Sequence, residues 1–161
     1  RLERMLESAE RERFDLAAVV AGCVEGYRAA YPERAIEYTP PNAPIPLEGV
    51  PDAFAELLDK LVENANDFAP AGTPVRISLE AVPHHARLAV ENDGPPLPEA
   101  ATRLFDSMVS LRTADEPRGE AHLGLGLYIV RLVAQFHRGQ VRAMNLPGGR
   151  GVRFEVTVLL P

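Results

Sequence analysis

The chain has 161 residues and a formal net charge of −6, with 17 Lys and Arg against 23 Asp and Glu. This acidic balance argues against a general nucleic-acid binder, because such proteins neutralise phosphates with clustered Lys and Arg. The length and the hydrophobic fraction of 46% fit one soluble globular domain with a real core. A single cysteine excludes an intrachain disulfide and fits a reducing compartment. No apolar run approaches the roughly 18 residues of a membrane span, and no signal peptide is visible. Because the first residue is Arg1 and not Met, we expect a piece of a longer protein.

The N-terminal part of the sequence predicts two helices followed by extended segments. Residues 1–13 carry apolar side chains at intervals of three to four residues, so we expect the end of an upstream dimerisation or linker helix, with a fraying terminus as the alternative. Asp15 is the predicted N-cap of a helix that runs to about Ala30. Strands are predicted at residues 35–39 and 45–48, on either side of a proline-rich loop.

The rest of the chain alternates helices with pairs of strands. The predicted elements are a helix from 51 or 52 to about 68, strands at 75–82 and 87–91 joined by a hairpin-like turn, a short helix at 98–105, an aperiodic loop at 106–121, an apolar helix at 123–136, and strands at 140–145 and 152–160. A loop of that length inside a compact domain is typical of a functional lid or of a disordered segment. This order predicts an α+β fold in which three long helices pack on one mixed, mostly antiparallel sheet.

One row of residues on the predicted helix at 51–68 stands out from its apolar face. Lys60, Asn64, Asp67 and Phe68 fall at i, i+4, i+7 and i+8, so they share one side of the helix. The amide oxygen of Asn64 could complete an Mg²⁺ octahedron whose other ligands are phosphates and waters. Taken alone, the helix does not distinguish this from an Asn that caps or hydrogen-bonds a loop.

A second polar segment follows the predicted strand that ends at residue 91. Asn92, Asp93 and Gly94 precede two prolines, so the chain is expected to turn sharply there. Gly94 permits a positive φ or the close approach of a flat ligand. Asn92 or Asp93 could accept a hydrogen bond from an exocyclic amine and so recognise a purine, and an ordinary turn is the alternative.

Gly124 and Gly126 form the third segment, and we expect them to open the apolar helix that follows. Exposed N–H groups at a helix start attract phosphate, and glycine lets the phosphate come close. Two glycines packed against the sheet are the alternative, because a single Gly-x-Gly is a weak signal.

In this order and spacing, the segments resemble the Bergerat-type ATP-binding domain shared by sensor histidine kinases, type II topoisomerases, heat-shock chaperones and mismatch-repair ATPases. Residues 61–65 resemble the N box, 92–95 the G1 box, 104–108 the F box and 124–130 the G2 box. The most similar branch is the histidine kinase catalytic domain, and the resemblance covers about residues 14–161. It implies a two-layer α/β sandwich with ATP held between the sheet, the helices and a flexible lid.

The resemblance also implies which residues act. Asn64 and Lys60 are the expected catalytic residues, with Asn64 as the metal ligand. The expected cofactors are ATP and Mg²⁺. The residues expected to bind the nucleotide are Asn64, Asp67, Phe68, Asn92, Gly94, Leu97, Leu123, Gly124, Leu125, Gly126 and Leu127.

The sequence departs from the usual pattern of this family at several of these positions. Asn92 replaces the usual Asp of the G1 box and Pro96 its last Gly; the amide can still accept from adenine but could also suit a guanine oxygen. Lys60 stands where histidine kinases usually have Asn and hydrolytic relatives have a water-activating Glu, which argues against a chaperone-like ATPase. Asp67 stands where many kinases have a basic residue, so Lys60 and Asp67 could be a charge swap.

The four histidines lie outside any phosphoacceptor motif: His84 and His85 in the hairpin turn, His122 in the lid and His137 at a helix end. We therefore expect the ATP-binding half of a protein-histidine kinase, which donates the γ-phosphate to a histidine on a dimerisation domain of the same parent protein. A response regulator is expected downstream, with no nucleic acid and no direct membrane contact. The expected location is cytoplasmic, in an inner-membrane sensor. The alternatives are a degenerate nucleotide-binding or interaction module and an anti-sigma-type serine kinase.

Overall fold

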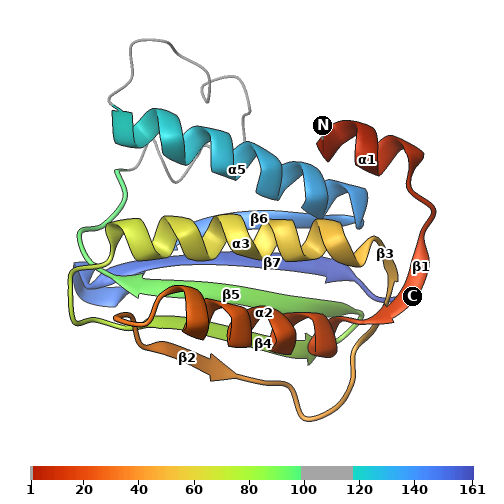
Figure 1. The fold of residues 1–161 in the computed structure, drawn as a ribbon, viewed down its shortest axis with the longest axis horizontal. Helices are drawn as coiled ribbons and strands as arrows, with labels where there is room; N and C mark the ends of the chain where they lie inside the picture. Colours follow the sequence, from red (N-terminus) through yellow and green to blue (C-terminus); the bar gives the residue numbers. More distant parts are fainter. Residues whose placement is uncertain (1, 99–117) are drawn as a thin grey trace.

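The computed structural model describes residues 2–98 and 118–161. Its elements are α1 (Leu2–Ser8), β1 (Glu12–Asp15), α2 (Leu16–Ala30), β2 (Ile36–Thr39), β3 (Pro46–Gly49), α3 (Pro51–Phe68), β4 (Val75–Val82), β5 (His85–Asp93), α5 (Arg118–Phe136), β6 (Gly139–Asn145), the 3₁₀ turn η2 (Pro147–Gly149) and β7 (Gly151–Leu159). Figure 1 shows α2, α3 and α5 layered on one face of a sheet. The predicted α+β class is confirmed.

The main sheet has five strands in the order β2-β4-β5-β7-β6. β2 pairs with β4 in parallel, and the other neighbours pair antiparallel, as the predicted mixed, mostly antiparallel sheet requires. Side chains alternate between the two faces of each strand, so every second residue of the central strands faces the helices. The buried inward residues include Val75, Ile77 and Leu79 of β4, Leu88 and Val90 of β5, and Val152, Phe154, Val156 and Val158 of β7.

The N-terminal segment differs from the prediction. The helix expected over residues 1–13 ends at Ser8, and Glu12–Asp15 forms β1, which pairs antiparallel with β3 as a second, two-stranded sheet. Arg11, just before β1, donates to the carbonyl oxygen of Phe136 at 2.6 Å, and its guanidinium lies 4.1 Å from the centre of that ring. These long-range contacts override the local helical pattern of residues 9–13.

Local signals set the start of α2 and α3 as predicted. The Asp15 carboxylate accepts from the backbone N–H of Ala17 at 2.9 Å, which satisfies one of the unpaired donors at the start of α2. The same oxygen accepts from Ile45 N at 2.9 Å. Pro51 occupies the first turn of α3, where its missing N–H costs nothing.

Hydrogen bonds to α2 and the loop after it fix the rotation of α3 about its axis. Tyr27 donates to the Asp59 carboxylate at 2.6 Å, and Arg34 donates to the Asn66 amide oxygen at 2.7 Å. Residues on a helix are about 100° apart, so Asn64 lies on the other edge of the buried stripe. That edge faces α5, because α3 lies between α2 and α5 (Figure 1).

The third long helix starts earlier than predicted. α5 begins at Arg118, so residues 118–121 are helical instead of belonging to the lid, and His122 also lies on the helix. The stretch from 118 to 136 contains no proline, and a glycine inside a helix costs only about 1 kcal/mol. Residues 99–105 of the predicted short helix and 106–117 of the predicted lid lie outside the described residues; Pro98 is not helical.

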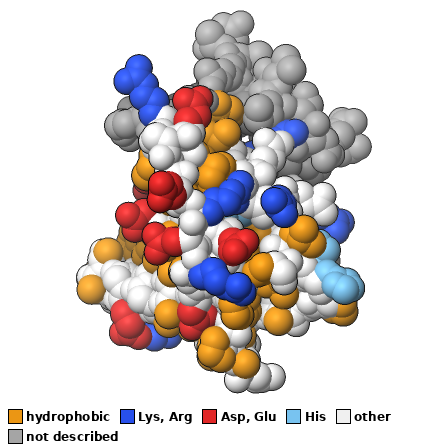
Figure 2. Space-filling model, turned by 90° about the vertical axis from the view of Figure 1, so that its right-hand side faces the viewer, with side chains coloured by type: hydrophobic (Ala, Val, Ile, Leu, Met, Phe, Trp, Pro, Cys, Tyr) orange, Lys and Arg blue, Asp and Glu red, His pale blue; other side chains and the backbone are white. Residues whose placement is uncertain are grey.

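The surface carries both signs of charge. At the end of the molecule that Figure 2 faces, basic and acidic side chains are interspersed among apolar ones. Among the described residues, no helix combines the length and apolarity that a membrane crossing requires.

Candidate functional site

The fold brings the second polar segment against the end of α3. β5 continues through Asp93, two residues beyond the predicted strand, and the turn begins at Gly94, whose φ is +134°. A Cβ at Gly94 would lie 3.1 Å from the carbonyl oxygen of Phe68 and 3.4 Å from Cδ of Pro70. The backbone angle favours glycine here, and a side chain would also crowd the carbonyl oxygen of Phe68.

Asn92 lies at the end of the inward-facing row of β5. Its side chain is buried, with 2% of the residue exposed. The amide Nδ2 donates to the carbonyl oxygen of Asp93 at 2.8 Å, which identifies the nitrogen because two acceptor oxygens would repel each other. The other end of the amide, Oδ1, is thereby presented as an acceptor. This orientation favours a donor such as an exocyclic amine over a guanine oxygen.

Asn64 carries a buried oxygen without a partner. Its Oδ1 is shielded from solvent and accepts no hydrogen bond from the residues that the structure describes. A buried polar atom in this condition is costly unless a ligand completes it. A neutral amide oxygen is a ligand that Mg²⁺ accepts. The residues present therefore fit a magnesium ion at Asn64.

Within residues 2–98 and 118–161, no group of three or more His, Cys, Asp or Glu side chains could hold a metal ion. Mg²⁺ is typically held by few protein oxygens together with phosphates and waters.

The neighbouring asparagine shows the contrast. Arg34 donates from Nε to Oδ1 of Asn66, and from its terminal nitrogens to the carbonyl oxygens of Asn66, Ala69, Pro70 and Thr73. Arg34 thus caps the C-terminal end of α3, where helix carbonyls lack partners. The two asparagines of α3 therefore differ in their hydrogen bonding. The Oδ1 atom of Asn66 accepts a hydrogen bond from Arg34, whereas the Oδ1 atom of Asn64 has no donor among the described residues.

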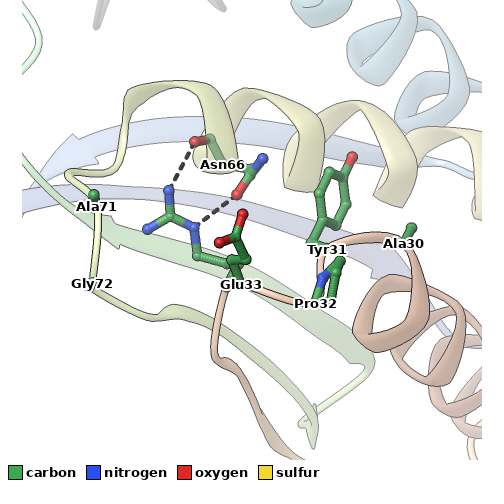
Figure 3. Close-up of a pocket in the computed structure, with 8 residues that line it drawn as sticks. Ala30, Tyr31, Pro32, Glu33, Asn66, Ala71 and Gly72 are labelled. Atoms are coloured by element: carbon green, nitrogen blue, oxygen red, sulfur yellow. Dashed lines mark hydrogen bonds between the residues drawn. The ribbon is translucent and has the colours of Figure 1, made fainter.

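The side of α3 that faces away from Asn64 borders a cavity of about 510 Å³. Its lining residues are Ala30, Tyr31, Pro32, Glu33, Arg34, Asn66, Ala71 and Gly72. Figure 3 shows Tyr31, Glu33 and Asn66 around it, with the hydrogen bonds to Asn66 as dashed lines. This cavity is separate from the predicted site residues.

The other predicted residues of α3 lie in its second half. Lys60 is half-buried, one turn before Asn64. Phe68 carries a large apolar side chain that is 43% exposed, and its backbone carbonyl oxygen lies close to Gly94. Burial raises the pKa of Tyr31, and the carboxylates of Glu63, Asp67 and Asp59 raise it further. Asp67 thus contributes to the raised pKa of Tyr31, the residue after α2, and its exchange with Lys60 stays a prediction.

Leu97 is held in place by a residue that sequence reasoning missed. Asn145, at the end of β6, accepts from Leu97 N at 2.8 Å and donates to Leu97 O at 3.1 Å. The two bonds pin the chain just after the G1 turn. The only signal in the sequence is an Asn at the end of a predicted strand, which is too common to single out.

The glycines of the third segment lie inside α5 and do not open it, contrary to the prediction. Leu123, Gly124 and Leu125 are described only as part of this helix. No described atom within 4 Å would meet a Cβ added at Gly126, so this glycine is not packed against the sheet. Leu127 is 3% exposed and belongs to the hydrophobic core, and its role in nucleotide binding stays a prediction.

Comparison with known proteins agrees with this arrangement. Residues 49–161 match the family described as "Histidine kinase-, DNA gyrase B-, and HSP90-like ATPase". The chain belongs to this family. An ATP-binding role follows for the domain, and the predicted recognition of a histidine kinase catalytic domain is confirmed.

Individual relatives agree with the family. The chain is 29% identical over 150 residues to "Sensor histidine kinase CusS" of Escherichia coli (strain K12), covering 92% of this chain and 31% of that protein. It is 32% identical over 152 residues to "Signal transduction histidine-protein kinase/phosphatase MprB" of Mycobacterium sp. (strain KMS), covering 93% of this chain and 29% of that protein. The chain therefore spans about a third of the length of these curated relatives.

Solved structures share the fold. "Mycobacterial sensor histidine kinase MprB" superposes with a TM-score of 0.76 at 23% identity, covering 93% of this chain and 97% of that one. The nucleotide-free "Catalytic domain of histidine kinase ThkA" has a TM-score of 0.75 at 23% identity, covering 94% and 97%. These likenesses confirm the predicted Bergerat-type arrangement of the ATP-binding domain.

Proposed function

We propose that this domain binds ATP together with Mg²⁺ between α3, the G1 turn and α5, and donates the γ-phosphate to a histidine on another domain of its parent protein. The observation that supports this best is the buried, unpartnered Oδ1 of Asn64. The oriented amide of Asn92 and the glycine at position 94 supply a matching place for a purine.

In this proposal each residue has a limited task. Asn92 Oδ1 accepts from the adenine amine, and Gly94 lets the ring approach. Asn64 would hold the metal, which when bound neutralises phosphate charge. Lys60, one turn away, adds a positive charge on the same side of α3. Transfer of a phosphoryl group depends mainly on such positioning and charge, with little covalent work by the domain.

Calorimetric titration tests the metal site. Wild type should bind ATP more tightly with Mg²⁺ than with EDTA, and Asn64→Ala should lose most of this difference, because its side chain has no oxygen for the metal. Asn66→Ala is the matched control, since Asn66 Oδ1 is already engaged by Arg34. Equal Mg²⁺ dependence in wild type and Asn64→Ala would refute the assignment.

Competition between nucleotides tests the purine site. Wild type should prefer ATP to GTP, and Asn92→Asp should keep ATP binding, because a carboxylate accepts from the same amine. Gly94→Ala should abolish binding, since its Cβ meets the end of α3. Equal affinity of wild type for both nucleotides would contradict the role of Asn92.

Phosphotransfer requires the rest of the parent protein. The relatives that the chain matches are named as sensor kinases and are about three times its length, which supports a separate phosphoacceptor domain. We propose that this partner domain and a downstream response regulator act with it in the cytoplasm. With radiolabelled ATP, acid-labile label should appear only when the upstream domain is added, and on that domain. Label on the isolated chain would contradict the proposal.

A further inference from the structure

The face of the sheet opposite the helices carries a chain of alternating charges. Three arginines and four carboxylates from β4, β5 and β7 are joined by ion pairs of 2.8–3.9 Å. Followed from one ion pair to the next, along the direction of the strands, they are Glu80, Arg87, Glu155, Arg153, Glu91, Arg76 and Asp93. This series of ion pairs ends at Asp93, which is the residue next to Asn92.

Asp93 connects the two faces of the sheet. Its carboxylate lies on the open face, where it accepts from Arg76 at 2.9 Å. Its backbone carbonyl accepts from Nδ2 of Asn92, the buried amide on the helix side. Arg76 also reaches the Glu91 carboxylate at 3.4 Å, so it joins two acidic residues of β5.

The peptide between Asp93 and Gly94 is the element that Arg76 can control. Gly94 has a φ of +134° and lacks the side chain that would restrict its rotation. The N–H of this peptide donates to Arg150 O at 3.2 Å, and its carbonyl oxygen accepts from Asn92. If the peptide rotated, the Asn92 amide would lose its acceptor and could turn its NH₂ group outward.

We propose that Arg76 is a positioning residue for base selection. From the open face of the sheet it holds Asp93, and through the Asp93 carbonyl it keeps the amide oxygen of Asn92 turned toward the adenine amine. This inference rests on the proposed function, because it concerns how the same site discriminates ATP from GTP. Arg76 itself touches neither the nucleotide nor the metal in this scheme.

The test measures the ratio of ATP to GTP affinity in Arg76→Gln, by calorimetry or competition in the full chain. The ratio should fall about fivefold, a size of effect typical for residues that share one network of hydrogen bonds and ion pairs. Arg87→Gln is the matched control. Arg87 also joins two carboxylates on the open face, at Glu80 and Glu155, and is exposed to a similar degree, 36% against 32%. Its ratio should stay within about twofold of wild type.

A second background separates positioning from general loosening. In Asn92→Asp the side chain has no NH₂ group to turn outward, so adding Arg76→Gln should leave the affinity ratio unchanged. Thermal unfolding of both arginine variants shows whether their stability losses match.

Three results would overturn the inference: an unchanged ratio in Arg76→Gln with ATP binding intact, the same fall in Arg87→Gln, or a fall that persists with Asn92→Asp. A wild-type chain that binds neither nucleotide would instead contradict the proposed function and this inference with it.

Discussion

Arg34 caps α3 from outside the helix, and its replacement by alanine should lower the free energy of unfolding by about 3 kcal/mol. Its guanidinium donates to the carbonyl oxygens of Asn66, Ala69, Pro70 and Thr73 at 2.6–3.2 Å, and to the Asn66 amide at 2.7 Å. No basic side chain lies in the last turn of α3 itself, so this cation from the loop after α2 is the charge that meets the negative end of the helix dipole.

The size of this loss in unfolding free energy depends on whether water can replace Arg34 at the oxygens that accept its hydrogen bonds. The site is only partly buried, so water can reach carbonyls that Arg34 leaves, and each bond counts at its net value of about 0.5–1.5 kcal/mol. With Thr73 Oγ1 at 3.4 Å, six acceptors share this one side chain. Their contributions are not additive, which gives about 3 kcal/mol. Arg34→Lys keeps the charge but not the planar fork of donors, so it should lose about half as much.

Urea unfolding followed by circular dichroism measures this effect, with Arg28→Ala as the control. Arg28 donates to one carbonyl, that of Ile36, and pairs with Glu25, whose side chain is 76% exposed. Its loss should cost about 1 kcal/mol. The reasoning would be refuted if Arg34→Ala cost no more than Arg28→Ala at equal m values.

Three further changes test other parts of the fold. Arg138 follows α5 with a φ of 58°, so Arg138→Gly should raise the free energy of unfolding by up to about 1 kcal/mol, whereas a loss would contradict the strain. Burial lowers the pKa of His137 from 6.5, and its Nε2 accepts from Val50 N. The unfolded chain therefore binds more protons below about pH 6.5, so stability should fall as the pH drops through this range, and His137→Gln should flatten the profile. Asp15→Ala removes an N-cap and the partner of Ile45 N, and should cost about 1–2 kcal/mol in thermal unfolding.

Helices whose starts are set by nearby residues could be predicted from the sequence. A strand that forms by pairing with a segment distant in the sequence could not. α2 and α3 match their predicted starts within a residue because Asp15 and Pro51 act on their own helices. β1 exists because it pairs with β3, more than thirty residues away, and nothing within residues 9–13 announces that pairing. Gly124 suggested a helix start, but α5 continues through it because packing of the helix on the core outweighs the small cost of a glycine.

The candidate site divides in the same way. Asn64, Asn92 and Gly94 could be chosen from residue type and order alone, and the φ of Gly94 agrees with the prediction. The residues that hydrogen-bond to the site residues from other strands could not be chosen in this way. Arg76 is 17 residues from Asp93, and Asn145 is 48 residues from Leu97. In the sequence, Arg76 and Asn145 look like any other polar residue on a strand, because their partners are distant along the chain.

Asn64 and Asn66 show what the third dimension adds to residue type. Both are amides on the same helix, and both are half-buried. Periodicity separates their faces, but it does not say which oxygen is available. Arg34, 32 residues before Asn66, occupies that amide; the described residues leave the oxygen of Asn64 without a donor. Tyr38 Oη and Arg87 Nε are also buried without a hydrogen-bond partner among the described residues, so an unsatisfied atom alone does not define a ligand position. Asn64 differs from them in its chemistry, because a neutral amide oxygen is a ligand that Mg²⁺ accepts, and a bound ligand is one way in which such a deficit is offset.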